Sequence, residues 1–120
     1  MLTLLTTYGL RGDLDRLPRL HRFLAQLRAE HAASTVRLLD LGASCDPAVW
    51  PCTVTGGRAT LIALDAMGYH AANVAGVLDA ASRDRLAAQV TLALVDGDHP
   101  YTEDGLRCFV GDPAPQDDSA

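Results

Sequence analysis

The chain has 120 residues, of which 48% are hydrophobic, and its 10 basic and 15 acidic side chains give a net charge of −5. This length predicts a single domain built on one core, and the hydrophobic content argues against a disordered chain. Every basic residue is an arginine. The acidic balance argues against nucleic-acid binding as the main task, because phosphate neutralisation needs a basic face. No apolar run approaches the roughly 18 residues of a membrane span.

The first residues do not have the pattern of a secretory leader. They lack a basic segment, and threonines at positions 3, 6 and 7 interrupt the apolar run. We therefore expect a cytoplasmic protein, and a mature exported form whose leader has been removed stays an open alternative.

The chain begins with a predicted strand at residues 2–7 and a predicted helix at about 15–31. Asp15 is placed to cap this helix, and Pro18 would then fall in its first turn, where a missing N–H costs little. The helix is predicted from leucines that recur at helical spacing. These leucines are Leu17, Leu20, Leu24 and Leu27.

The middle of the chain predicts a strand, a loop and a buried helix. Residues 36–41 are nearly all apolar, as in a strand that is covered on both faces. Two prolines and a Gly-Gly pair in residues 43–57 predict a loop. A helix at about 58–67 should end at Gly68, which is a favourable residue after a helix C-terminus.

A short strand at 71–74, a helix at about 79–89 and a strand at 90–95 complete the expected elements. The alternation of strands and helices predicts an α/β fold with a mostly parallel or mixed sheet. We expect one domain over residues 1–110 and a disordered acidic tail over 111–120, which carries two prolines and three aspartates.

Three stretches share a framework in which an apolar strand, or a helix and strand, runs into a loop. They are residues 2–14, 38–43 and 67–78. In spacing they resemble the three metal-binding loops of the calcineurin-like metallophosphatases of the 5′-nucleotidase type. That family has Asn-Asp-x-His-Gly, Gly-Asp and Gly-Asn-His-Glu in these loops. The positions that would hold metal are occupied here by Gly9, Arg11, Ala43, Gly76 and Val77.

These replacements remove the expected chemistry. Hydrolytic metal centres need carboxylate, imidazole or amide donors, which glycine, alanine and valine do not have. The guanidinium of Arg11 would repel a dication beside it. The resemblance therefore implies a degenerate domain with no metal, no cofactor and no catalytic residue.

The resemblance extends over residues 2–79 and implies only half of a metallophosphatase-like sandwich. A half sandwich leaves a sheet edge and an apolar face uncovered. We therefore expect a non-catalytic subunit that binds another protein chain or forms a homo-oligomer.

A second resemblance gives a rival interpretation. Residues 94–101 resemble the DGDH-x-Y loop of some class I S-adenosylmethionine-dependent O-methyltransferases. Residues 39–43 would then correspond to the cofactor loop, and Asp65 to the acid that contacts the ribose. The candidates for holding a metal or orienting a substrate would be Asp96, Asp98 and His99.

Two features weigh against the methyltransferase interpretation. The loop at residues 41–45 has one glycine, whereas close approach of the backbone to a cofactor favours several. The prolines that follow do not predict the helix expected there. An isolated Asp/His loop is also commonly a turn with capping side chains.

The three cysteines permit one pair at most. Cys45 and Cys52 are spaced so that they could form a small disulfide in an oxidising compartment. For a cytosolic chain we expect reduced thiols at both positions and at Cys108. The spacing of cysteines and histidines does not match a zinc site.

Overall fold

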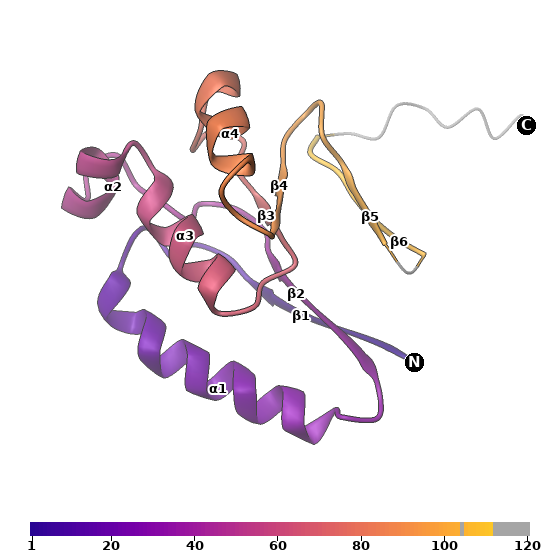
Figure 1. Cartoon of the computed structure of the whole chain (residues 1–120). Coiled ribbons are helices and arrows are strands. Elements are labelled where there is room, and N and C mark those ends of the chain that lie inside the picture. Colours follow the sequence, from indigo (N-terminus) through magenta and orange to yellow (C-terminus); the bar gives the residue numbers. More distant parts are fainter. Residues whose placement is uncertain (104, 112–120) are drawn as a thin grey trace, which may run out of the picture.

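The computed structural model describes residues 1–103 and 105–111 and shows an α/β fold, as predicted. Four strands form a parallel sheet in the order β1-β2-β3-β4 (Figure 1). They are β1 (Leu2–Thr7), β2 (Thr35–Asp40), β3 (Ala71–Asn73) and β4 (Ala93–Val95). The predicted strands at 2–7, 36–41 and 71–74 are therefore confirmed to within a residue.

Helices make the three connections between parallel strands. They are α1 (Leu17–Glu30), α2 (Trp50–Thr55), α3 (Arg58–Ala66) and α4 (Ala80–Ala87), and a short 3₁₀ turn, η1 (Leu14–Arg16), precedes α1. Crossovers between parallel strands are right-handed, so consecutive strand order places successive helices on the same face of the sheet. Figure 1 shows α1, α3 and α4 on one side of the strands.

The main core lies between this helix layer and the sheet. It is built chiefly from leucines of β2, α3, α4 and β4, with Tyr69 and Val74 beside them. The most deeply buried of the leucines are Leu38, Leu61, Leu64, Leu86 and Leu94.

An antiparallel hairpin covers part of the opposite face. Its strands are β5 (Tyr101–Glu103) and β6 (Leu106–Cys108). Tyr101 joins residues of β2, β3 and β4 in a second small core, and Arg37 of β2 forms an ion pair with Glu103 at 3.0 Å. Figure 1 shows the hairpin on the side away from the helices.

The loop predicted over residues 43–57 is wrong in part, since it contains α2. Pro51 lies in the first turn of that helix, where its missing N–H leaves no hydrogen bond unmade. The hydroxyls of Thr53 and Thr55 bond backbone carbonyls four residues earlier. Pro51, which the sequence pattern places in a loop, thus lies in the first turn of α2.

Two further expectations need correction. Asp15 does not cap the first helix but lies inside η1, and no side-chain cap forms at Arg16, although Pro18 does fall in the first turn. The strand expected at 90–95 is only β4, because Thr91 and Leu92 precede it and donate their backbone N–H groups to the Asp65 carboxylate.

The remaining expectations concern the end of the chain and one glycine. The hairpin of β5 and β6 was not predicted. Gly68 ends the third helix as expected, at φ +88°. The tail expected over 111–120 lies outside the described residues from position 112 onward.

Candidate functional site

The loops that follow β1 and β2 lie side by side at the carboxyl edge of the sheet. The backbone N–H of Gly9 donates to the carbonyl of Gly42 at 3.1 Å, and that of Arg11 donates to Ala43 at 2.9 Å. The next pair is Gly12 and Ser44, at 2.7 Å. The structure therefore brings together Gly9, Arg11 and Ala43, which the resemblance had aligned with metal ligands.

The third loop joins the same edge. The Asn73 side chain at the end of β3 donates to the carbonyl of Leu41 at 3.0 Å. Gly76 and Val77 follow within one turn, and a Cβ on Gly57 would come within 2.9 Å of the Val77 side chain. All five positions that the resemblance aligns with metal ligands thus lie on loops at one edge of the sheet.

This edge is poor in groups that bind a cation. Arg11 and Ala43 both adopt left-handed backbone conformations, with φ of +58° and +52°. Of the five positions only Arg11 carries a polar side chain, and it is cationic. Within residues 1–103 and 105–111, no group of three or more His, Cys, Asp or Glu side chains is arranged to hold a metal ion.

A disulfide occupies the space next to these loops. Cys45 and Cys52 are bonded, with their Cα atoms 5.6 Å apart, so the expectation of reduced thiols at these positions is wrong in this structure. Cys52 is buried, and a Cβ on Gly12 would collide with its sulfur. The bond therefore ties α2 to the loop that follows β2, and the sulfur of Cys52 packs against Gly12 in the loop that follows β1. Cys108 is a free thiol, and burial raises its pKa.

An apolar hollow of about 300 Å³ opens beside the disulfide. It is lined by both cysteines, by Pro47 and by residues of the third loop, including Gly76 and Val77. The part of the edge that the resemblance assigns to metal binding therefore presents methyl groups, sulfur and glycine backbone to the solvent.

Sequence reasoning missed a buried carboxyl group at the end of β2. Asp40 is only 2% exposed, and its Oδ1 accepts a hydrogen bond from the Thr7 hydroxyl at 2.8 Å. The Thr7 hydroxyl also lies 3.1 Å from that of Tyr69. Burial raises the pKa of Asp40 to about 6, and hydrogen bonds from Thr7 and the Gly42 backbone offset this only in part. The signal in the sequence was a single acid that directly follows two leucines at the end of the strand.

The rival loop after β4 is a tight turn. The Asp96 carboxylate lies 2.7 Å from Nδ1 of His99 and accepts the backbone N–H of Asp98 at 2.9 Å. Arg83 approaches the second oxygen of Asp96 at 4.0 Å. The pKa of Asp96 is lowered by these partners, although desolvation acts in the opposite direction. The oxygens of Asp96 thus bind groups of the same turn and the nearby Arg83.

Asp65, to which the methyltransferase interpretation assigns contact with the ribose, lies at a different edge of the sheet from the loop at residues 41–45. Asp65 is near the C-terminus of α3, and its carboxylate binds the backbone just before β4, at the amino edge of the sheet. The loop at residues 41–45 is at the carboxyl edge. The structure therefore does not bring Asp65 together with that loop.

No family model, no curated protein and no solved structure matches this chain. None of the helices in the described part of the chain has the length and apolar character needed to cross a membrane.

Proposed function

We propose that this chain is a non-catalytic, metallophosphatase-like domain that acts by binding, as a protein-binding or self-associating subunit. The observation that carries the proposal is the outer strand of the sheet. β1 pairs with β2 along one edge, and among the described residues no strand pairs with its other edge.

The sequence of β1 favours pairing with another chain. Isolated proteins protect exposed edge strands with charged residues, prolines or bulges. The segment Leu-Thr-Leu-Leu-Thr-Thr has no charge and no proline, and all six residues are in register with β2. Such an edge presents free backbone N–H and C=O groups and side chains of high β-propensity.

The face of β1 beside this edge is also uncovered. Leu2 and Leu4 point away from the helix layer and are 38% and 43% exposed. The hairpin reaches Arg37 of β2 but leaves these leucines in solvent. Complete burial of an exposed leucine contributes about 1.5–3 kcal/mol. Contact of a second chain with this face would gain a fraction of that from each of the two partly exposed leucines.

The non-catalytic half of the proposal is supported by the carboxyl edge. Its former ligand positions offer no oxygen or imidazole side chain, and an apolar hollow lies beside them. A ligand that binds the folded chain and is present at 100 times its Kd would add about 2.7 kcal/mol to the free energy of unfolding. We expect no such stabilisation by Mn²⁺ or Zn²⁺ in a thermal-shift assay. The same assay with S-adenosylmethionine tests the methyltransferase interpretation, and we expect no stabilisation by this ligand either. Two tightly bound metal ions per chain, or hydrolysis of phosphate esters, would overturn this half.

Self-association is the form of the proposal that can be tested with the purified chain alone. Light scattering should show dimers whose fraction rises with concentration. Leu4→Glu places a charge on the uncovered face of both copies and should raise the dissociation constant by about tenfold or more, because 1.4 kcal/mol corresponds to a factor of ten.

The matched control is Ile62→Glu. Ile62 is 50% exposed on α3, which belongs to the helix layer on the other face, and its replacement adds the same charge. We expect this variant to dimerise as the parent does. A parent protein that stays monomeric at every concentration, or a Leu4→Glu variant that dimerises unchanged, contradicts self-association through β1.

A further inference from the structure

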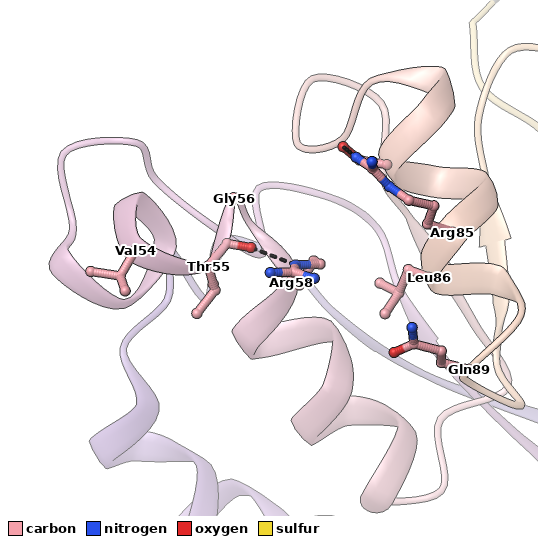
Figure 2. Close-up of a pocket in the computed structure, with 8 residues that line it drawn as sticks. Val54, Thr55, Gly56, Arg58, Arg85, Leu86 and Gln89 are labelled. Carbon is pink, nitrogen blue, oxygen red and sulfur yellow. Dashed lines mark hydrogen bonds between the residues drawn. The ribbon is translucent and has the colours of Figure 1, made fainter.

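A second pocket lies on the helix layer, away from β1, and shares Gly56 with the hollow beside the disulfide. It is a hollow of about 440 Å³ between the junction of α2 and α3 on one side and α4 on the other. Figure 2 shows Leu86 and Gln89 pointing from α4 toward the guanidinium of Arg58, while the side chain of Arg85, on the same helix, extends away from them to the Ser82 hydroxyl. Its polar lining includes hydrogen-bond donors from both sides, Arg58 on one and Ser82, Arg85 and Gln89 on the other.

The two arginines are available to a ligand. Arg58 donates through Nε to the Thr55 carbonyl at 2.7 Å, which fixes the side chain at the pocket and leaves both Nη groups facing outward from that bond. Arg85 makes one long hydrogen bond, from Nη2 to the Ser82 hydroxyl at 3.3 Å. Among the described residues, neither arginine has a carboxylate within 4.0 Å.

The pocket is positive in a molecule that is negative overall. The net charge of the chain is −5, yet no acidic residue lines this hollow. A nearby carboxylate, that of Asp79, accepts the Ser82 backbone N–H at 2.7 Å as the cap of α4. Its pKa is lowered chiefly by the hydrogen bonds from Ser82 and to a smaller extent by Arg85. The charge of Asp79 therefore offsets part of that of Arg85, and Arg58 is not among the groups that lower the pKa of Asp79.

We propose that this pocket binds the phosphate group of a small phosphomonoester. Planar guanidinium groups match phosphate oxygens in paired hydrogen bonds. Two guanidiniums with the Ser82 hydroxyl and the Gln89 amide supply more donors than the two oxygens of a carboxylate accept, whereas a phosphate has three terminal oxygens. Val54 from α2 and Leu86 from α4 add apolar surface on the two sides of the pocket for the organic part of the ligand.

Titration followed by two-dimensional NMR tests the proposal, with phenyl phosphate, inorganic phosphate and benzoate as probes. We expect phenyl phosphate to bind most tightly and to shift the amides of residues 55–58 and 82–89. Inorganic phosphate should shift the same amides more weakly, because it lacks the apolar part. Benzoate should bind least.

Arg58→Gln and Arg85→Gln should each weaken phenyl phosphate binding by tenfold or more. Arg22→Gln, on the exposed side of α1, removes the same charge far along the chain and should leave the affinity unchanged. A lower affinity in higher salt is expected as well.

The proposal is overturned if phenyl phosphate produces no saturable shifts at this pocket, if benzoate binds as tightly, or if both arginine variants keep the affinity of the parent. Unfolding of a variant would show as collapse of its NMR spectrum, and the ligand comparison on the parent protein still decides the question. The pocket is on the opposite face from Leu4, so this test is independent of whether the chain self-associates.

Discussion

At the scale of single residues, the buried carboxyl group of Asp40 makes the stability of the fold depend on pH. Its pKa rises from 3.8 to about 6 in the folded state because burial penalises the charge. The folded protein therefore holds a proton that the unfolded chain has lost between these two values. The contribution of Asp40 is most favourable below pH 4 and is lost as the pH rises toward 6. The loss is roughly 3 kcal/mol at most.

Asp40→Asn removes this titration and keeps an acceptor for the Thr7 hydroxyl. We expect the variant to be more stable than the parent at pH 7 and to lose that advantage near pH 4. Urea unfolding between pH 4 and pH 7.5 measures the difference.

Asp15→Asn, at an exposed position in η1, is the control and should follow the pH profile of the parent. Other titrating groups are common to all three proteins, so only the differences between the profiles are interpreted. An Asp40→Asn profile parallel to that of the parent would show that the charge of Asp40 is not penalised by the fold.

Two glycines of the first loop form a matched pair. Both have positive φ, +74° at Gly9 and +79° at Gly12. A Cβ at Gly9 meets nothing within 4 Å, whereas at Gly12 it collides with the sulfur of Cys52. Gly9→Ala should cost about 1–2 kcal/mol from backbone strain alone. Gly12→Ala should cost clearly more in the same denaturation assay.

Equal losses for the two variants would mean that the disulfide does not press against the loop. This pair of substitutions therefore tests the local geometry of the carboxyl edge without changing any charge.

The sequence could place Gly9 and Ala43 at the same edge of the sheet, but it could not give the state of Asp40. Carboxyl ends of parallel strands meet at one edge, and the pairing of β1 with β2, which brings the two residues together, is known only from the structure. The pKa of Asp40 depends on what covers it. That cover includes Tyr69, which is 29 residues away in the sequence and is brought near by the fold.

At the scale of elements, the disulfide between Cys45 and Cys52 is the strongest restraint on α2. It closes a short loop, and the loss of chain entropy in the unfolded state corresponds to about 2–3 kcal/mol. We expect the Cys45→Ser/Cys52→Ser double variant to lose about this much stability.

Trp50 begins α2 and is the only tryptophan of the chain, so its fluorescence reports on this helix. Treating the parent with a reductant should reproduce the effect of the double variant, and Cys108→Ser is the control. Parent protein that is equally stable with and without reductant would contradict a stabilising role for the bond.

The elements that the sequence predicted well are those whose signal is local. The leucine spacing of α1 and the apolar run of β2 are examples, and both were confirmed. The helix α2 was missed because proline breaks the interior of a helix but is tolerated in its first turn, where Pro51 lies. The hairpin was missed because its strands have three residues each and depend on the sheet face beneath Tyr101.

At the scale of the whole molecule, the topology explains why one face is incomplete. Strands that follow one another in space as in sequence receive all their right-handed crossovers on one side. The other side is left to the hairpin, which packs on β2, β3 and β4 and leaves Leu2 and Leu4 of β1 exposed. Alternation of elements in the sequence indicated an α/β fold, but it could not specify this strand order.

The central claim is that β1 is a binding edge, and hydrogen exchange measured at low and high protein concentration tests it most directly. If a second copy pairs with β1, the backbone N–H groups of residues 2–7 should exchange more slowly as the protein concentration rises, while those of the exposed face of α1 stay unchanged. Exchange in β1 that is the same at every concentration would contradict the account.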